Sequence, residues 1–172
     1  MTSLHRLVLV GLLGSSCTAP ARGQRELVVR DLQIMVPEGW GVTWDPDSTV
    51  LLFPPSDRST SLRISGLTAV SPRPLVATAA RDWLRDSRTI PAATIETFSS
   101  GASMATKDSV FTETGVLVHI RSWYLAQASL PDTLHIGIIS LAQEVKGVGD
   151  SLRGSYVAAA EHLVRTATYR RH

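Results

Sequence analysis

Residues Gly115–Gln143, GVLVHIRSWYLAQASLPDTLHIGIISLAQ, decide the fold, because they read as two long strands joined by a turn. Residues 116–126 and 134–143 alternate with period two and are rich in β-branched and aromatic side chains, which is the strand signature. Between them, residues 130–133 (LPDT) supply the turn, with the proline pre-set for the first central position. Both alternating faces carry apolar residues, so we expect the hairpin to lie in a sheet covered at least partly on both sides.

The rest of the chain alternates runs of strands with single helices. The helix predicted over residues 71–86 carries Trp83 on the same face as Leu75 and Ala79, so we expect that indole to be largely buried. Strands in runs, with only two helices, predict an α+β domain with an antiparallel β-sheet and two main helices packed on it. Residues 27–36 are expected to form either one strand or a tight strand pair that bends at Arg30-Asp31. The other expected elements are strands at 49–53, 61–67, 94–98 and 109–112, and a last helix at 151–168.

This order of elements, with the VPEGW turn at residues 36–40 and the SLRI strand at 61–64, resembles the PsbP-like family. That family includes extrinsic proteins of photosystem II, a nuclear protein that binds the Ran GTPase, and exported or lipid-anchored bacterial relatives. The resemblance implies an antiparallel sheet with helices packed on it, and an accessory or partner-binding role without catalysis. It implies no functional residue in this chain.

Composition narrows the class of protein. The chain has 172 residues, 44% of them hydrophobic, which suits one globular domain that we expect at residues 22–172. A single cysteine excludes an internal disulfide. The formal net charge is only +2, and the arginines are scattered along the chain instead of forming a basic stripe, so we expect no nucleic-acid partner.

Residues 1–21 read as an export signal peptide. A short basic start is followed by the apolar run LVLVGLL at 7–13, which is too short to span a bilayer. Two cleavage patterns remain open. Ala19-Pro20-Ala21 suits ordinary signal peptidase, whereas LGSSC at 13–17 resembles a bacterial lipobox, in which Cys17 would be lipidated and would anchor the protein to a membrane. Either pattern predicts an exported protein, in the periplasm or outer envelope.

Two short strings match catalytic motifs. Residues 149–152 (GDSL) resemble the nucleophile block of esterases, but the twenty residues after it offer His162 and no aspartate to complete a triad. Residues 45–49 (DPDST) match the start of haloacid-dehalogenase phosphatases, whose mechanism also needs a lysine and a further acidic pair. Gly154 stands where the second aspartate of that pair should be, and the alternating βα units are missing. We therefore expect Asp150 or Ser151 to cap the last helix and Asp45 to lie in a solvated turn.

The histidines and tryptophans provide the remaining candidates. His119 and Arg121 share one strand face and His135 lies on the facing strand, but no further ligand joins them, so we expect polar side chains on a half-wet face and no metal site. The tryptophans are expected to be mostly core. Exposed indoles near Arg121 would mark a partner surface, with Trp44, Arg121 and Trp123 as the candidates.

The sequence thus predicts a non-catalytic exported accessory or binding module at the cell envelope, with no cofactor, no catalytic residue and no metal. Its partner would be an envelope protein or a small ligand. The alternative is a small hydrolase, an esterase or phosphatase, that uses Ser151 or Asp45 as its nucleophile.

Overall fold

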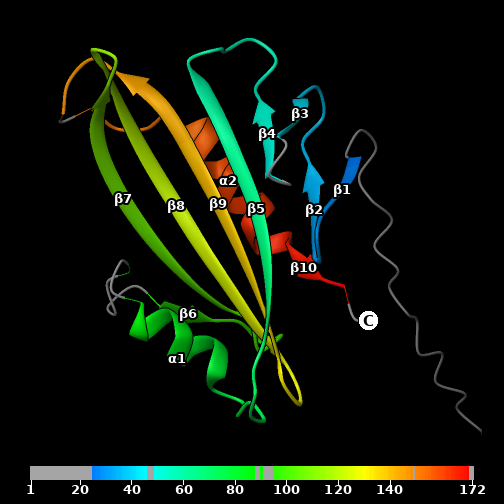
Figure 1. Ribbon diagram of the computed structural model, residues 1–172. Coiled ribbons are helices and arrows are strands. Elements are labelled where there is room, and N and C mark those ends of the chain that lie inside the picture. Colours follow the sequence, from blue (N-terminus) through cyan, green and yellow to red (C-terminus); the bar gives the residue numbers. More distant parts are fainter. Residues whose placement is uncertain (1–24, 46–48, 88–89, 91–94, 149, 171–172) are drawn as a thin grey trace, which may run out of the picture.

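The structure is a computed structural model that describes residues 25–45, 49–87, 90, 95–148 and 150–170. Figure 1 shows long strands that run the length of the molecule, with helix α1 at one end and helix α2 behind them. The described elements, in chain order, are β1 (Arg25–Val29), β2 (Leu32–Val36), β3 (Gly41–Asp45), β4 (Thr49–Phe53), β5 (Thr60–Val70), α1 (Ala79–Asp86), β6 (Ile95–Thr97), β7 (Ser103–Glu113), β8 (Val116–Ser129), β9 (Thr133–Val145), α2 (Gly154–Thr166) and β10 (Thr168–Tyr169).

The larger sheet has seven strands in the order β3-β4-β5-β9-β8-β7-β6, and each neighbouring pair is antiparallel. The predicted hairpin is confirmed as β8 and β9 at the centre of this sheet. Its register runs from Leu117 opposite Val145 to Ser129 opposite Thr133. The strand β7, expected only as a short piece, pairs with β8 over eleven residues and completes a sheet of long curved strands (Figure 1).

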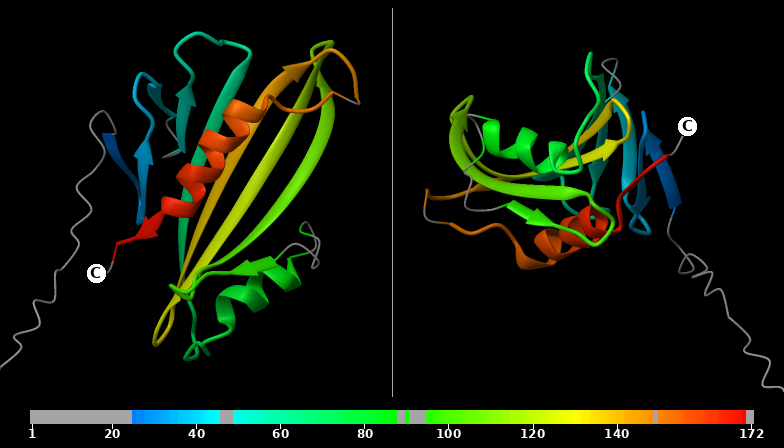
Figure 2. Two further views of the ribbon diagram at one scale, coloured as in Figure 1. Left: turned by 180° about the vertical axis from the view of Figure 1, so that it is seen from behind. Right: turned by 90° about the horizontal axis from the view of Figure 1, so that it is seen from below.

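The alternation along the hairpin gives the sheet two differently covered faces. On one face, Trp123 belongs to the same buried cluster as Val164 of α2. On the other face, Ala126 belongs to a second cluster with Leu84 of α1, and Tyr124 packs against it. Figure 2 shows the two helices on opposite sides of the sheet, which we name the α2 face and the α1 face. The prediction that the hairpin is covered on both faces is confirmed.

A second sheet of three strands, β1-β2-β10, contributes to the core on the α2 face, where Leu32 is fully buried. Two glycines, Gly66 and Gly137, are directly paired across β5 and β9 beneath it. A Cβ at Gly66 would lie 2.6 Å from the carbonyl oxygen of Val29, and one at Gly137 would lie 3.0 Å from the side chain of Leu32. The small sheet can approach this closely because both positions lack a side chain.

The predicted fold class was wrong. Within the described residues, ten strands and two helices of eight and thirteen residues make a mainly β fold, not an α+β fold dominated by two main helices. The sheet is antiparallel as expected, but the helices were predicted too long. Residues 71–75 lie against the central hairpin instead, where the N–H groups of Ser71 and Leu75 donate to the carbonyls of Asp132 and Pro131.

The second helix also begins later than predicted. Its N-cap is Arg153, whose N–H donates to the side-chain oxygen of Gln143 at 2.8 Å. Asp150 instead accepts from the N–H groups of Lys146 and Gly147 in the preceding loop. Helix α2 therefore starts without the Asp150 or Ser151 cap that the sequence predicted.

Candidate functional site

An open groove crosses the α2 face and ends at the turn of the central hairpin. It consists of two depressions of about 560 and 650 Å³ that share Ser100 and Gln127 in their walls. The first lies between the β6–β7 loop and the junction of α2 with β10. The second lies between the end of the hairpin and the end of β5, where Thr68 and His135 line it. We call the two together the α2-face groove.

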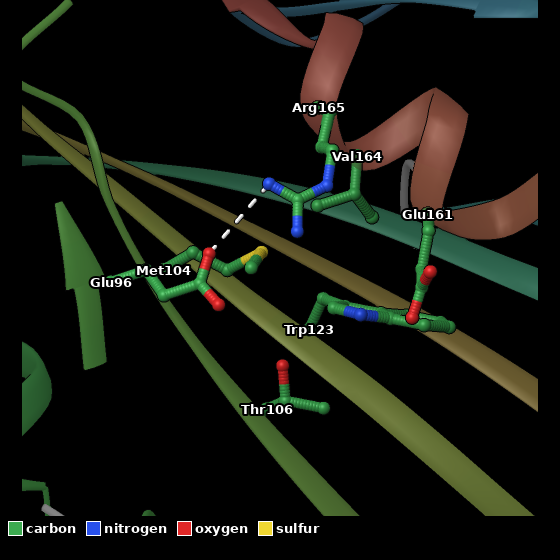
Figure 3. A pocket seen from close by; sticks show the side chains of 7 residues that line it. All are labelled: Glu96, Met104, Thr106, Trp123, Glu161, Val164 and Arg165. Atoms are coloured by element: carbon green, nitrogen blue, oxygen red, sulfur yellow. Dashed lines mark ion pairs between the residues drawn. The ribbon is translucent and has the colours of Figure 1, made fainter. Parts of the chain in front are cut away.

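Beside this groove a smaller cavity of about 70 Å³ lies under α2. Figure 3 shows Trp123 and Met104 reaching from the sheet toward Val164 of the helix. Arg165 and Glu96 form an ion pair across the opening, with nitrogen and oxygen 3.7 Å apart (Figure 3). Both side chains are more than half exposed, so the pair adds little stability.

The hairpin end of the groove is polar because of strand register. Thr68 on β5, His135 on β9 and Gln127 on β8 are direct cross-strand partners, so their side chains stand in one row on the α2 face. Ser129, two residues beyond Gln127 on β8, points to the same face. Hydrogen-bonding side chains from three adjacent strands thus meet where the hairpin turns.

The turn between β1 and β2 adds a carboxylate to this row. Arg30 has a φ of 55°, the left-handed conformation that reverses the chain tightly, and Asp31 follows it. His135 Nδ1 lies 3.2 Å from Asp31 Oδ2, and His135 Nε2 lies 3.1 Å from the Ser129 hydroxyl oxygen. The hydroxyl of Thr68 donates to the same carboxylate oxygen. We call Asp31, His135 and Ser129 the polar cluster.

Burial and an aromatic neighbour hold the imidazole in place. His135 is only 4% exposed, and its ring stacks on Tyr169 with centroids 5.4 Å apart. The Tyr169 hydroxyl donates to the carbonyl of Leu125 at 3.2 Å, and burial raises the pKa of the phenol well above its usual value. Tyr169 therefore serves as a neutral wall that fixes the plane of the His135 ring.

A second polar group lies farther along the same face. Arg121 donates twice to Asp108, at 2.8 and 2.9 Å, and His119 Nε2 lies 3.7 Å from that carboxylate. These hydrogen bonds hold the pKa of Asp108 below its usual range and raise the pKa of Arg121. Because the arginine is already paired with an acid of the same sheet, its charge is largely satisfied within the chain.

The three residues expected to form a partner surface are not brought together. Trp123 is 2% exposed and belongs to the core, whereas Trp44 is 53% exposed on the edge strand β3. Strands β4, β5 and β9 separate the strands that carry them. Arg121 lies half-buried on the same face as Trp123.

The two nucleophiles suggested by sequence motifs, Ser151 and Asp45, both lie in the described part of the chain. Ser151 is exposed, and no hydrogen bond joins its hydroxyl to another described residue. Asp45 lies half-buried at the end of β3, opposite Thr49. Asp47 and Gly149 of the two motifs lie outside the described residues, as do the predicted signal peptide at 1–21 and Cys17.

Metal binding by side chains and membrane crossing by helices are two further possibilities for the described residues. No group of three or more histidine, cysteine, aspartate or glutamate side chains is placed to hold a metal ion. Neither described helix has the length and hydropathy that crossing a membrane would need.

Sequence reasoning placed His135 on a half-wet face and missed the polar cluster. Ser129 and His135 flank the predicted turn, so the hairpin register alone could have brought them together. Asp31 is 104 residues from His135, and no sequence pattern indicated that the bend at Arg30-Asp31 would lie over the end of that hairpin.

Comparisons with known proteins give a fold but no family. No family model and no curated protein matches the chain, so the resemblance to the PsbP-like family stays a prediction. A crystal structure of a protein from Bacteroides thetaiotaomicron is similar, with a TM-score of 0.54 and 16% identity over 83% of this chain. The match spans 46% of that protein, so this chain corresponds to less than half of its length.

The second similar structure is LpqN of Mycobacterium tuberculosis, described as involved in cell envelope biogenesis. The TM-score is 0.50 and the identity 11%, over 86% of this chain and 91% of LpqN. At such identities the likeness to these two bacterial proteins concerns the fold alone.

Proposed function

We propose that this protein is an accessory module of the cell envelope that binds a partner or a small ligand in the α2-face groove. The observation that carries the proposal is the groove itself, two adjoining open depressions of about 560 and 650 Å³. Ligand sites are usually concave and carry a few convergent polar groups that orient the ligand. Here Leu125 and Val164 provide the apolar part, while Gln127 and Ser100 provide hydrogen-bonding groups.

The envelope location has two supports. LpqN, which matches over nearly its whole length, is described as involved in cell envelope biogenesis. The sequence of residues 1–21 has the pattern of an export signal. In this proposal the exported chain begins either at a lipidated Cys17 or near Arg22.

The N-terminal alternatives are separated by intact-mass measurement and fractionation of the protein from its native envelope. Lipidation predicts a diacylglyceryl mass on Cys17 and release of the protein from membranes by Cys17→Ala. Ordinary cleavage predicts an unmodified start near Arg22 and no effect of that substitution. An N-terminus still at Met1 would contradict export by either route.

The binding proposal is tested by filling the groove. Gln127→Trp places a large side chain where the two depressions meet, so molecules that co-purify with the tagged protein from envelope extracts should be lost. Lys107→Trp is the matched control, because Lys107 is paired with Ser122 and its side chain lies on the α1 face. Equal recovery of the same molecules with wild type and Gln127→Trp would contradict the proposal.

A further inference from the structure

We propose that Ser129 is an activated nucleophile, with His135 as its general base and Asp31 as the residue that positions the base, and that the site accepts acyl groups from esters. The inference goes beyond binding in the groove, and it replaces the expectation that the protein is not an enzyme. It rests on the geometry of the polar cluster and on its place at the open end of the groove.

The two ring nitrogens of His135 have different partners, as a general base requires. Ser129 Oγ lies 3.1 Å from Nε2, and Asp31 Oδ2 lies 3.2 Å from Nδ1. With the proton on Nδ1 donated to the carboxylate, Nε2 is left with a lone pair directed at the serine hydroxyl. This is the arrangement by which a serine becomes a nucleophile on unrelated folds.

The arrangement is held from several sides. Thr68 donates to Asp31 Oδ2, which fixes the carboxylate, and Tyr169 stacks on the imidazole. The close contact at Gly66 seats the β1–β2 turn, which carries Asp31, against the sheet. Nucleophile, base and positioning residue therefore come from three segments locked by the fold, which is how preorganised sites are built.

The serine is also accessible. Ser129 and His135 both line the depression of about 650 Å³, together with Leu130 and Pro131 of the turn and the polar side chain of Gln127. The mixture of apolar and polar walls suits a short acyl group with a polar leaving group. The amide of Gln127 stands on the same face, two residues before the nucleophile, and is the candidate donor to the oxyanion that forms during attack.

The reaction balances with water as the only co-reactant. Ser129 Oγ attacks the ester carbonyl carbon and its proton passes to His135 Nε2. The bond from that carbon to the leaving oxygen breaks as Nε2–H protonates the departing alcohol. Water then attacks the acyl-serine, gives its proton to Nε2, and releases the carboxylic acid while Ser129 Oγ regains its proton.

The test is covalent labelling of the full mature chain by an alkyl fluorophosphonate, followed by peptide mass spectrometry. The Oγ–P bond forms and fluoride leaves, so an activated serine gains a defined mass at one position. We expect labelling of Ser129 in the wild type and none in Ser129→Ala. His135→Gln should slow labelling about 100-fold or more, which is the usual contribution of a general base.

Two further variants separate catalysis from structure. Ser140→Ala is the matched control, because the Ser140 hydroxyl bonds to Ser122 at 2.8 Å and no histidine of the described residues is its partner. Labelling of Ser129 should be unchanged. For the positioning residue, Asp31→Asn should lose labelling and Asp31→Glu should restore part of it, with melting temperatures recorded for both. Absence of adduct on wild-type Ser129, or full-rate labelling in a folded His135→Gln protein, would overturn the proposal.

Discussion

At the scale of single residues, two glycines decide where the small sheet lies on the large one. Gly66 and Gly137 are paired across β5 and β9. The space that a side chain on either glycine would need is taken by atoms of Val29, Leu32 and Tyr169. No periodicity in the sequence predicts this contact, because a glycine inside a strand indicates close approach without saying of what. The seating of Asp31 over His135 depends on it.

Gly66→Ala tests this contact. The new Cβ would lie 2.6 Å from the backbone oxygen of Val29, which cannot rotate away, so the two sheets must separate. We expect a loss of about 1–3 kcal/mol in the free energy of unfolding, the range for overpacked cores, measured by urea denaturation. Gly41→Ala is the control, since its Cβ would find only ordinary contacts at 3.9 Å. Equal effects of the two substitutions would show that the close approach carries no strain.

A second prediction at this scale concerns Asp57, which is buried and ties a loop to α2. It accepts from the N–H and hydroxyl of Ser59 at 2.8 and 2.6 Å and from Arg153 at 2.5 Å. The hydrogen bond from the Ser59 hydroxyl is the largest cause that holds the pKa of Asp57 below its usual value of 3.8. Because the pKa is lowered on folding, the ionised carboxylate contributes its full stabilisation at pH values above the usual pKa of 3.8. This stabilisation is lost as the pH falls through the folded-state pKa.

Asp57→Asn should therefore destabilise the protein by about 1–3 kcal/mol at pH 7, where the charged hydrogen bonds are complete. The difference from wild type should shrink as the pH falls below 3.8. Urea denaturation of both proteins at several pH values measures it. A difference that stays constant down to the most acidic pH at which both proteins fold would contradict the assignment.

At the scale of elements, the sequence predicted strands better than helices. Period-two alternation placed β8 and β9 correctly, because each has a local pattern, and of the two alternatives for residues 27–36 the structure shows the strand pair with its bend at Arg30-Asp31. The first helix was predicted from residue 71, yet Ser71 and Leu75 bond to the hairpin turn and α1 begins at Ala79. The start of α1 therefore depends on hydrogen bonds to residues some sixty positions away in the chain, and local helix propensity carries no information about such contacts.

Because α1 is shorter than predicted, Trp83 is expected to contribute less to the free energy of unfolding than a fully buried tryptophan would. Trp83 is half-buried, not largely buried as predicted, whereas Leu84 is fully buried in the cluster on the α1 face. Leu84→Ala should therefore cost about 2–5 kcal/mol in the free energy of unfolding, and Trp83→Ala should cost less than Leu84→Ala. Chemical denaturation of the two variants ranks them. A larger loss for Trp83→Ala would mean that the indole is the main anchor of α1.

At the scale of the whole molecule, the α2 face and the α1 face have different roles. The α2 face carries the small sheet, α2, the groove and the polar cluster. The α1 face carries the second core cluster and a short helix. The sequence predicted that both faces would be covered, but not which would hold a groove, because the groove depends on how α2 and the β6–β7 loop leave the sheet uncovered between them. The width of this uncovered part of the sheet is determined by contacts between residues that are distant in the sequence.

The central claim, that the α2-face groove is where the protein meets its partner at the envelope, has a direct test. A photo-crosslinking amino acid is placed at Gln127 in the groove or, as control, at Lys107 on the α1 face, and intact cells are irradiated. We predict crosslinked species from Gln127, fractionating with the envelope, and none of the same species from Lys107. Crosslinks from Lys107 alone, or a protein that does not fractionate with the envelope, would contradict the claim.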